Sequence, residues 1–111
     1  MSFVDKSLLK GVNDQTLSFF NTTIPFTTAQ VRIDTLTEFQ AYIRKFRIRN
    51  DDAIAPLTFR QGGLSEPLKT IPILSEDGGE GWESFLEINP NAVSGSGFLE
   101  LDLINREDAL R

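Results

Sequence analysis

Cysteine and histidine are both absent from this sequence of 111 residues. Without cysteine, the chain can form no disulfide and offers no thiolate as a nucleophile or soft metal ligand. Without histidine, it lacks the commonest general base and the commonest transition-metal ligand. Structural zinc sites draw on these two residue types. We therefore expect no zinc site, no other cofactor and no enzymatic activity.

Long apolar runs are also missing. No stretch approaches the ~18 consecutive apolar residues of a membrane-spanning helix. The first ten residues lack the basic segment and long apolar run of a secretory signal peptide. We therefore expect a soluble protein of the cytoplasm or of a virus particle, with no membrane partner and no secretion through a recognisable signal peptide.

The apolar residues that are present suit one globular domain over residues 1–111. Hydrophobic residues make up 40% of the chain, and nine phenylalanines are spread along nearly its whole length. A disordered chain is usually poor in such residues, because it cannot bury enough apolar surface to offset the entropy of ordering. Residues 1–11 fit either a short helix that ends at Gly11 or a mobile N-terminal arm.

Most of the chain reads as short strands separated by turn residues. The clearest alternation lies in residues 98–104, where Leu99, Leu101 and Leu103 are expected to face inward. Several such strands predict a mainly β (α+β) fold, which is an antiparallel β-sandwich or a partly open barrel.

One amphipathic helix is expected at about residues 35–45. Thr35 and Glu38 have the spacing of a capping box at its start. Apolar residues then follow at helical steps: Leu36, Phe39, Ile43 and Phe46. The alternative is a strand through residues 39–49. We prefer the helix because the alternation changes parity around residues 44–46.

The two halves of the chain carry opposite charge. Residues 1–62 hold eight basic and six acidic residues, whereas residues 63–111 hold three basic and ten acidic ones, so the halves carry +2 and −7. The positive charge peaks in a basic strip, which consists of Arg44, Lys45, Arg47 and Arg49. An acidic pI of about 4.6 and the neighbouring Asp51 and Asp52 argue against a nucleic-acid partner.

The negative half contains a glycine-rich acidic segment, residues 75–83, which we expect to be a loop around a turn at residues 78–81. Its candidate binding residues are Glu76, Asp77, Glu80 and Trp82. Two carboxylate pairs also occur, Glu83 with Glu87 and Glu100 with Asp102. Such pairs arise from ordinary polar-outward alternation, so they do not predict catalysis.

The sequence therefore favours a non-catalytic structural module that binds proteins. The expected partner is another copy of the chain or a larger assembly, and an accessory component of a phage or virus particle is one concrete form. We expect partner contacts at Arg44, Lys45, Arg47, Arg49, Glu76, Asp77, Glu80 and Trp82, because opposite charges favour specific association. The alternative is a small domain that binds carbohydrate or calcium through the 75–83 loop and Trp82.

Overall fold

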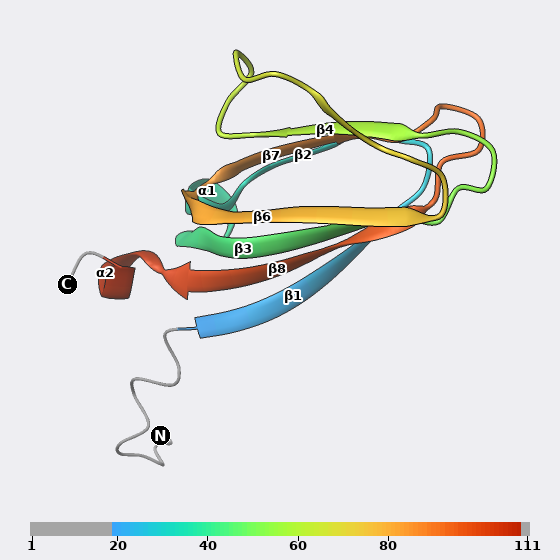
Figure 1. Cartoon of the computed structure of the whole chain (residues 1–111). Helices are drawn as coiled ribbons and strands as arrows, with labels where there is room; N and C mark the ends of the chain where they lie inside the picture. Colours follow the sequence, from blue (N-terminus) through green and yellow to red (C-terminus); the bar gives the residue numbers. More distant parts are fainter. Residues whose placement is uncertain (1–18, 110–111) are drawn as a thin grey trace.

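Two four-stranded antiparallel sheets pack face to face in the computed structural model, which describes residues 19–109 (Figure 1). The first sheet has the order β1-β8-β3-β6, and the second has the order β2-β7-β4-β5. The first sheet consists of β1 (Phe19–Phe26), β8 (Gly97–Asn105), β3 (Ala41–Asn50) and β6 (Ser75–Glu83). The second consists of β2 (Val31–Asp34), β7 (Phe85–Asn89), β4 (Leu57–Gln61) and β5 (Lys69–Ile71).

This strand order is the jelly-roll arrangement, in which eight strands form two sheets through Greek-key connections. The predicted antiparallel sandwich is confirmed. Two short helices, α1 (Thr35–Glu38) and α2 (Arg106–Ala109), lie at one end of the sandwich (Figure 1). None of the helices in the described part of the chain is long and apolar enough to cross a membrane. The predictions for residues 1–11 lie outside the described residues.

The core lies between the sheets and is built by strand alternation. Leu99, Leu101 and Leu103 are fully buried, as their spacing predicts. Phe46 of the first sheet meets Phe59 of the second edge-to-face, with ring centroids 6.0 Å apart. This arrangement is favourable for aromatic rings, so the pair ties the two layers together near the middle of the core.

The predicted helix over 35–45 begins near the right place but ends at Glu38, so its second half is wrong. Asp34, not Thr35, is the N-cap, and its side chain accepts a hydrogen bond from the amide of Leu36 at 3.1 Å. Gln40 then adopts a φ of 52°, and β3 begins at Ala41. A β-bulge at Arg44 inserts one extra residue into β3, so the inward-facing Ile43 and Phe46 are three positions apart. A bulge thus produces the spacing that resembled a helical face.

The predicted loop over 75–83 is also wrong, because these residues form the edge strand β6. Its glycines allow close packing against β3. A Cβ on Gly78 would lie 2.2 Å from the carbonyl oxygen of Phe46, and one on Gly79 would lie 2.9 Å from the Phe46 ring. Gly81 has a φ of 127°, which side chains rarely permit. The glycine cluster therefore marks tight strand pairing and not a hairpin turn.

Candidate functional site

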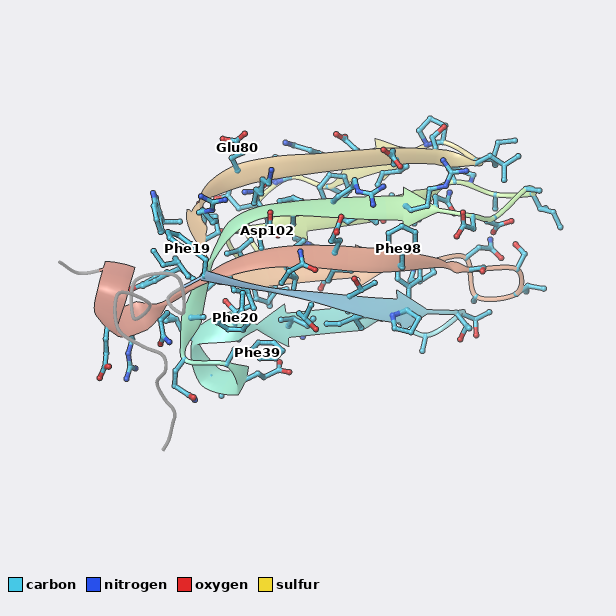
Figure 2. The ribbon with its side chains drawn as sticks, turned by 90° about the horizontal axis from the view of Figure 1, so that it is seen from below. Phe19, Phe20, Phe39, Glu80, Phe98 and Asp102 are labelled. Carbon is cyan, nitrogen blue, oxygen red and sulfur yellow. The ribbon has the colours of Figure 1, made fainter. Side chains whose placement is uncertain are left out.

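The outer face of the first sheet gathers most of the charged residues that the sequence singles out. Basic residues project from β3, and acidic residues project from the strands on both sides of it (Figure 2). The register places Lys45 between Asp102 and Glu80, and Arg49 between Phe98 and Glu76. The basic strip and the acidic segment are therefore neighbouring strands of one sheet.

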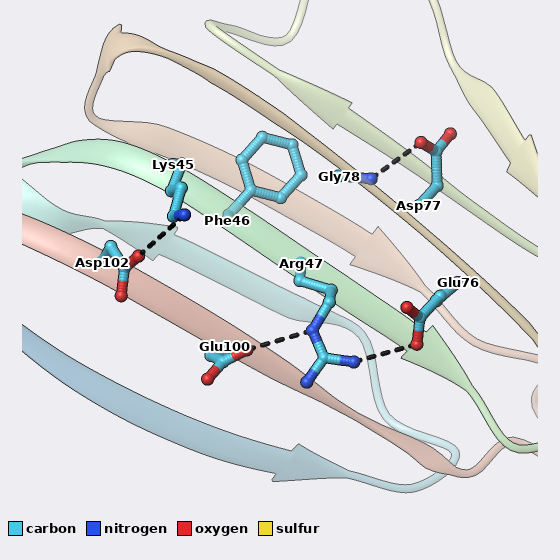
Figure 3. A pocket seen from close by; sticks show the side chains of 8 residues that line it. All are labelled: Lys45, Phe46, Arg47, Glu76, Asp77, Gly78, Glu100 and Asp102. Carbon is cyan, nitrogen blue, oxygen red and sulfur yellow. Dashed lines mark hydrogen bonds and ion pairs between the residues drawn. The ribbon is translucent and has the colours of Figure 1, made fainter.

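Arg47 is at the centre of this charged face. Its Nη1 lies 2.9 Å from Oε1 of Glu76, and its Nε lies 3.0 Å from Oε1 of Glu100 (Figure 3). Its guanidinium also lies 5.2 Å from the centroid of the Phe98 ring. The hydrogen bond from Arg47 to Glu100 is the main cause of a raised pKa for Arg47, with Glu76 adding to it. Through its ion pairs with Glu76 and Glu100, Arg47 joins β6, β3 and β8 across the face.

The other residues of the basic strip also contact groups of their own chain. Lys45 lies 3.8 Å from a carboxylate oxygen of Asp102, and Arg49 lies 2.8 Å from one of Asp51. Arg44, the bulged residue, places its guanidinium 4.9 Å from the centroid of the Phe19 ring. Such cation–π contacts are favourable even at exposed sites. The strip is therefore largely neutralised by residues of its own chain.

The predicted residues of the acidic segment do not all share this face. Glu76 and Glu80 lie on it, opposite Arg49 and Lys45. Asp77 is in register with the buried Ile48, so its side chain points the other way and accepts a hydrogen bond from the amide of Gly78 at 2.7 Å (Figure 3). Trp82 lies near the end of β6 and is 56% exposed. The structure thus unites most of the predicted residues but separates Asp77 from them.

A groove of about 460 Å³ runs over this face, between the side chains of β8, β3 and β6 (Figure 3). Its floor is open where Gly78 carries no side chain opposite Arg47. The groove is lined by Lys45, Phe46, Arg47, Glu76, Asp77, Gly78, Glu100 and Asp102. Charges of both signs line it, so it suits a ligand that both donates and accepts hydrogen bonds.

The edge strand β1 has a different chemistry, which the sequence analysis missed. None of its eight residues is charged, and Phe19 and Phe20 are 47% and 37% exposed. Phe20 stacks edge-to-face on Phe39 beside α1, with ring centroids 6.5 Å apart (Figure 2). A shallow pocket of about 330 Å³ opens beside Phe19, Phe20 and Arg44. The available signal was the uncharged run over residues 19–26.

The second sheet carries a buried carboxylate on its outer side. The oxygens of Glu87 accept hydrogen bonds from Arg60 Nε and Arg32 Nη2, each at 2.8 Å. These two arginines, Arg60 first, hold the pKa of Glu87 below its ordinary value. Arg60 also donates from Nη1 to the carbonyl oxygen of Leu64, which fastens the β4–β5 connection over the site. Glu87 thus joins β2, β7 and β4, and it lies in a different sheet from Glu83.

The described residues contain no group of three or more His, Cys, Asp or Glu side chains that could hold a metal ion. Comparison of the chain with family models, curated proteins and solved structures finds no match. Its function must therefore be argued from its own surfaces.

Proposed function

We propose that this chain is a non-catalytic interaction module that associates with copies of itself through the β1 edge of the first sheet. One observation carries the proposal. At one side of the first sheet, among the described residues, lies an eight-residue edge strand without charge, and two of its aromatic side chains are exposed.

A free strand edge presents backbone N–H and C=O groups that can pair with another chain. Proteins usually protect such edges with charges, prolines, bulges or very short strands. β6 follows this rule, because four of its nine residues are acidic. β1 has only Pro25, near its far end, and is otherwise long, regular and uncharged. A weakly protected edge on one side of the sheet and a strongly charged edge on the other support a binding role for β1.

The charges of the first sheet support a copy of the chain as the partner. The basic residues Lys45, Arg47 and Arg49 already contact carboxylates of their own copy. An uncharged edge can meet an identical edge without repulsion, whereas two acidic edges cannot. Jelly-roll domains are used as building blocks of particle shells, among other roles. A phage or virus particle component is therefore one concrete form of the assembly, by fold-level analogy alone.

Sedimentation velocity of the full chain from micromolar to millimolar concentration tests this function. We expect a reversible dimer or larger species that does not dissociate as salt rises, because the proposed contact contains no charge. A chain that stays monomeric at every concentration would rule out self-association. Dissociation in high salt would instead point to the charged face of the first sheet.

The second candidate function is the binding of a neutral carbohydrate in the groove over β8, β3 and β6. The observation in its favour is the groove itself, whose volume of about 460 Å³ lies within the range of small-ligand sites. Carboxylates can accept hydrogen bonds from sugar hydroxyls, and Arg47 and Lys45 can donate to them. A glycan array with wild-type protein and Glu100→Gln tests this candidate. A signal that the variant loses would support it, and no signal would remove it.

A further inference from the structure

We infer that two copies pair through β1 in antiparallel fashion around a two-fold axis at Thr22, and so form one continuous eight-stranded sheet. This inference rests on the proposed self-association and adds the geometry of the contact. The partner is a second copy of this chain.

The register with β8 fixes which side chains of β1 share a face. Phe20, Thr22 and Ile24 are opposite the inward-facing leucines of β8. Phe19, Asn21 and Thr23 are on the outer face. Residues directly opposite each other in an antiparallel pair point to the same face of the sheet. Inward-facing residues of one copy must therefore lie opposite inward-facing residues of the other. The two-fold axis that relates the two strands then places one residue directly opposite the same residue of the second copy.

Pro25 indicates which backbone groups are free. It has no amide hydrogen, so within a strand its nitrogen belongs on the side that faces no neighbour. Backbone groups alternate from side to side along a strand. Hence Asn21 and Thr23 direct their N–H and C=O groups toward the free edge, as Pro25 does. These two residues can exchange both backbone hydrogen bonds when they lie opposite each other.

An axis at Thr22 brings Asn21 opposite Thr23 of the second copy and Phe20 opposite Ile24. Aromatic and β-branched residues are a favourable cross-strand pair. An axis at Asn21 would instead pair Phe20 with Thr22 and use only residues 19–23 of β1. The axis at Thr22 engages more of the strand than that. An axis at Thr23 would engage as many residues but would place Phe19 opposite residue 27, outside β1, whereas the axis at Thr22 includes both exposed phenylalanines.

Charge along the first sheet favours this edge over β6. In the paired sheet the two β6 strands are seven strand spacings apart, or about 34 Å at ~4.8 Å per strand. That separation is several times the ~8 Å screening length at physiological salt. Pairing through β6 would instead place two strands with four acidic residues each next to one another, where directly opposite Cβ atoms are only about 5 Å apart.

Cysteine cross-linking tests the geometry, since the chain has no cysteine of its own. In the full chain, Thr22→Cys should give a disulfide-linked dimer on mild oxidation. Opposite residues of an antiparallel pair have their Cα atoms about 4.5–5.5 Å apart, which suits a disulfide. Glu80→Cys on β6 is the matched edge control and should stay uncross-linked.

A mixture of Asn21→Cys and Thr23→Cys chains provides an independent test if Thr22→Cys folds poorly. The mixture should cross-link at least tenfold more than either variant alone, because only unlike chains bring the two cysteines together. Cross-linking of Asn21→Cys alone would move the axis and overturn this register. A wild-type dimer without any β1 cross-link would overturn the contact but leave self-association standing. A wild-type monomer at all concentrations would overturn both.

Discussion

The strands β1 and β6 are on opposite sides of the same sheet, yet they expose different chemistry. β6 consists mostly of acidic residues and glycines, and Arg47 ties it to β3 through Glu76. β1 has no charge and ends its sheet with two exposed phenylalanines. In the proposed self-association, this difference in charge directs pairing to β1 and away from β6.

The largest expected effect concerns how tightly β6 is held. The methyl group of Gly78→Ala would lie only 2.2 Å from the carbonyl oxygen of Phe46. We expect a loss of about 2–3 kcal/mol in the free energy of unfolding, because the strands must separate to make room. Gly63→Ala is the control, since a Cβ there meets nothing within 4 Å. It should change the stability by less than about 0.5 kcal/mol in urea unfolding.

The next prediction inserts charge into the weakly protected edge. Thr23→Lys should weaken dimerisation at least tenfold, or by about 1.4 kcal/mol, because each lysine then lies opposite Asn21 and diagonally across the axis from the lysine of the second copy, where the two like charges repel. The folded monomer should tolerate the lysine, because Thr23 lies opposite Glu100 of β8. Glu80→Gln on β6 is the control and should leave the dimer unchanged. Sedimentation equilibrium of the three proteins measures the effect, and equal constants would contradict the role of β1.

Lowering the pH should reduce the stability of the fold but should not change the dimerisation constant. The arginines Arg60 and Arg32 hold the pKa of Glu87 below its ordinary value of 4.5. As pH falls, the unfolded chain binds this proton before the folded one does. The contribution of ionised Glu87 to the free energy of unfolding is therefore full above pH 4.5. It is lost as the pH falls from there through the folded pKa of Glu87. Urea unfolding should show this loss, with a flatter pH slope in Glu87→Gln.

The proposed dimer contact should not follow the same pH dependence, because β1 contains no titratable residue. The dimerisation constant should stay level across the range in which the chain is folded. A constant that changes in step with carboxylate titration would contradict the uncharged contact.

The smallest expected effect concerns the exposed charges on the first sheet. Lys45→Gln removes a loose pair, in which Lys45 Nζ lies 3.8 Å from Asp102, and the lysine side chain is 56% exposed. Exposed pairs contribute little, so the stability should change by less than about 0.5 kcal/mol. Dimerisation should also stay unchanged. A tenfold weaker dimer would restore the basic strip as the binding surface.

Local sequence pattern predicted those parts of the fold that depend on burial. The alternation of Leu99, Leu101 and Leu103 identified the central strand β8, and all three are fully buried. The start of α1 was indicated to within one residue, because Thr35 was expected as the N-cap and Asp34 is the N-cap in the structure. The pattern failed where a single residue changes the periodicity. The bulge at Arg44 gave β3 the spacing of a helix face, and glycines needed for packing gave β6 the composition of a loop.

The candidate site depends on long-range pairing, which no local pattern contains. The sequence shows opposite charges at residues 44–49 and 75–83, but only the strand order places β6 beside β3. The bridge from Arg47 to Glu76 and Glu100 follows from that order. Likewise, residues 19–26 are all uncharged in the sequence, yet only the topology makes them an edge.

Hydrogen exchange of the wild-type chain at several concentrations tests most directly whether β1 is the self-association edge. The amides of Asn21 and Thr23 should exchange more slowly as concentration rises, because the second copy protects them. The amides on the free side of β6 should exchange at the same rate throughout. Protection of β1 that is already complete in the dilute monomer would show that the edge is covered within a single copy. That result, or concentration-dependent protection of β6 instead of β1, would contradict the account.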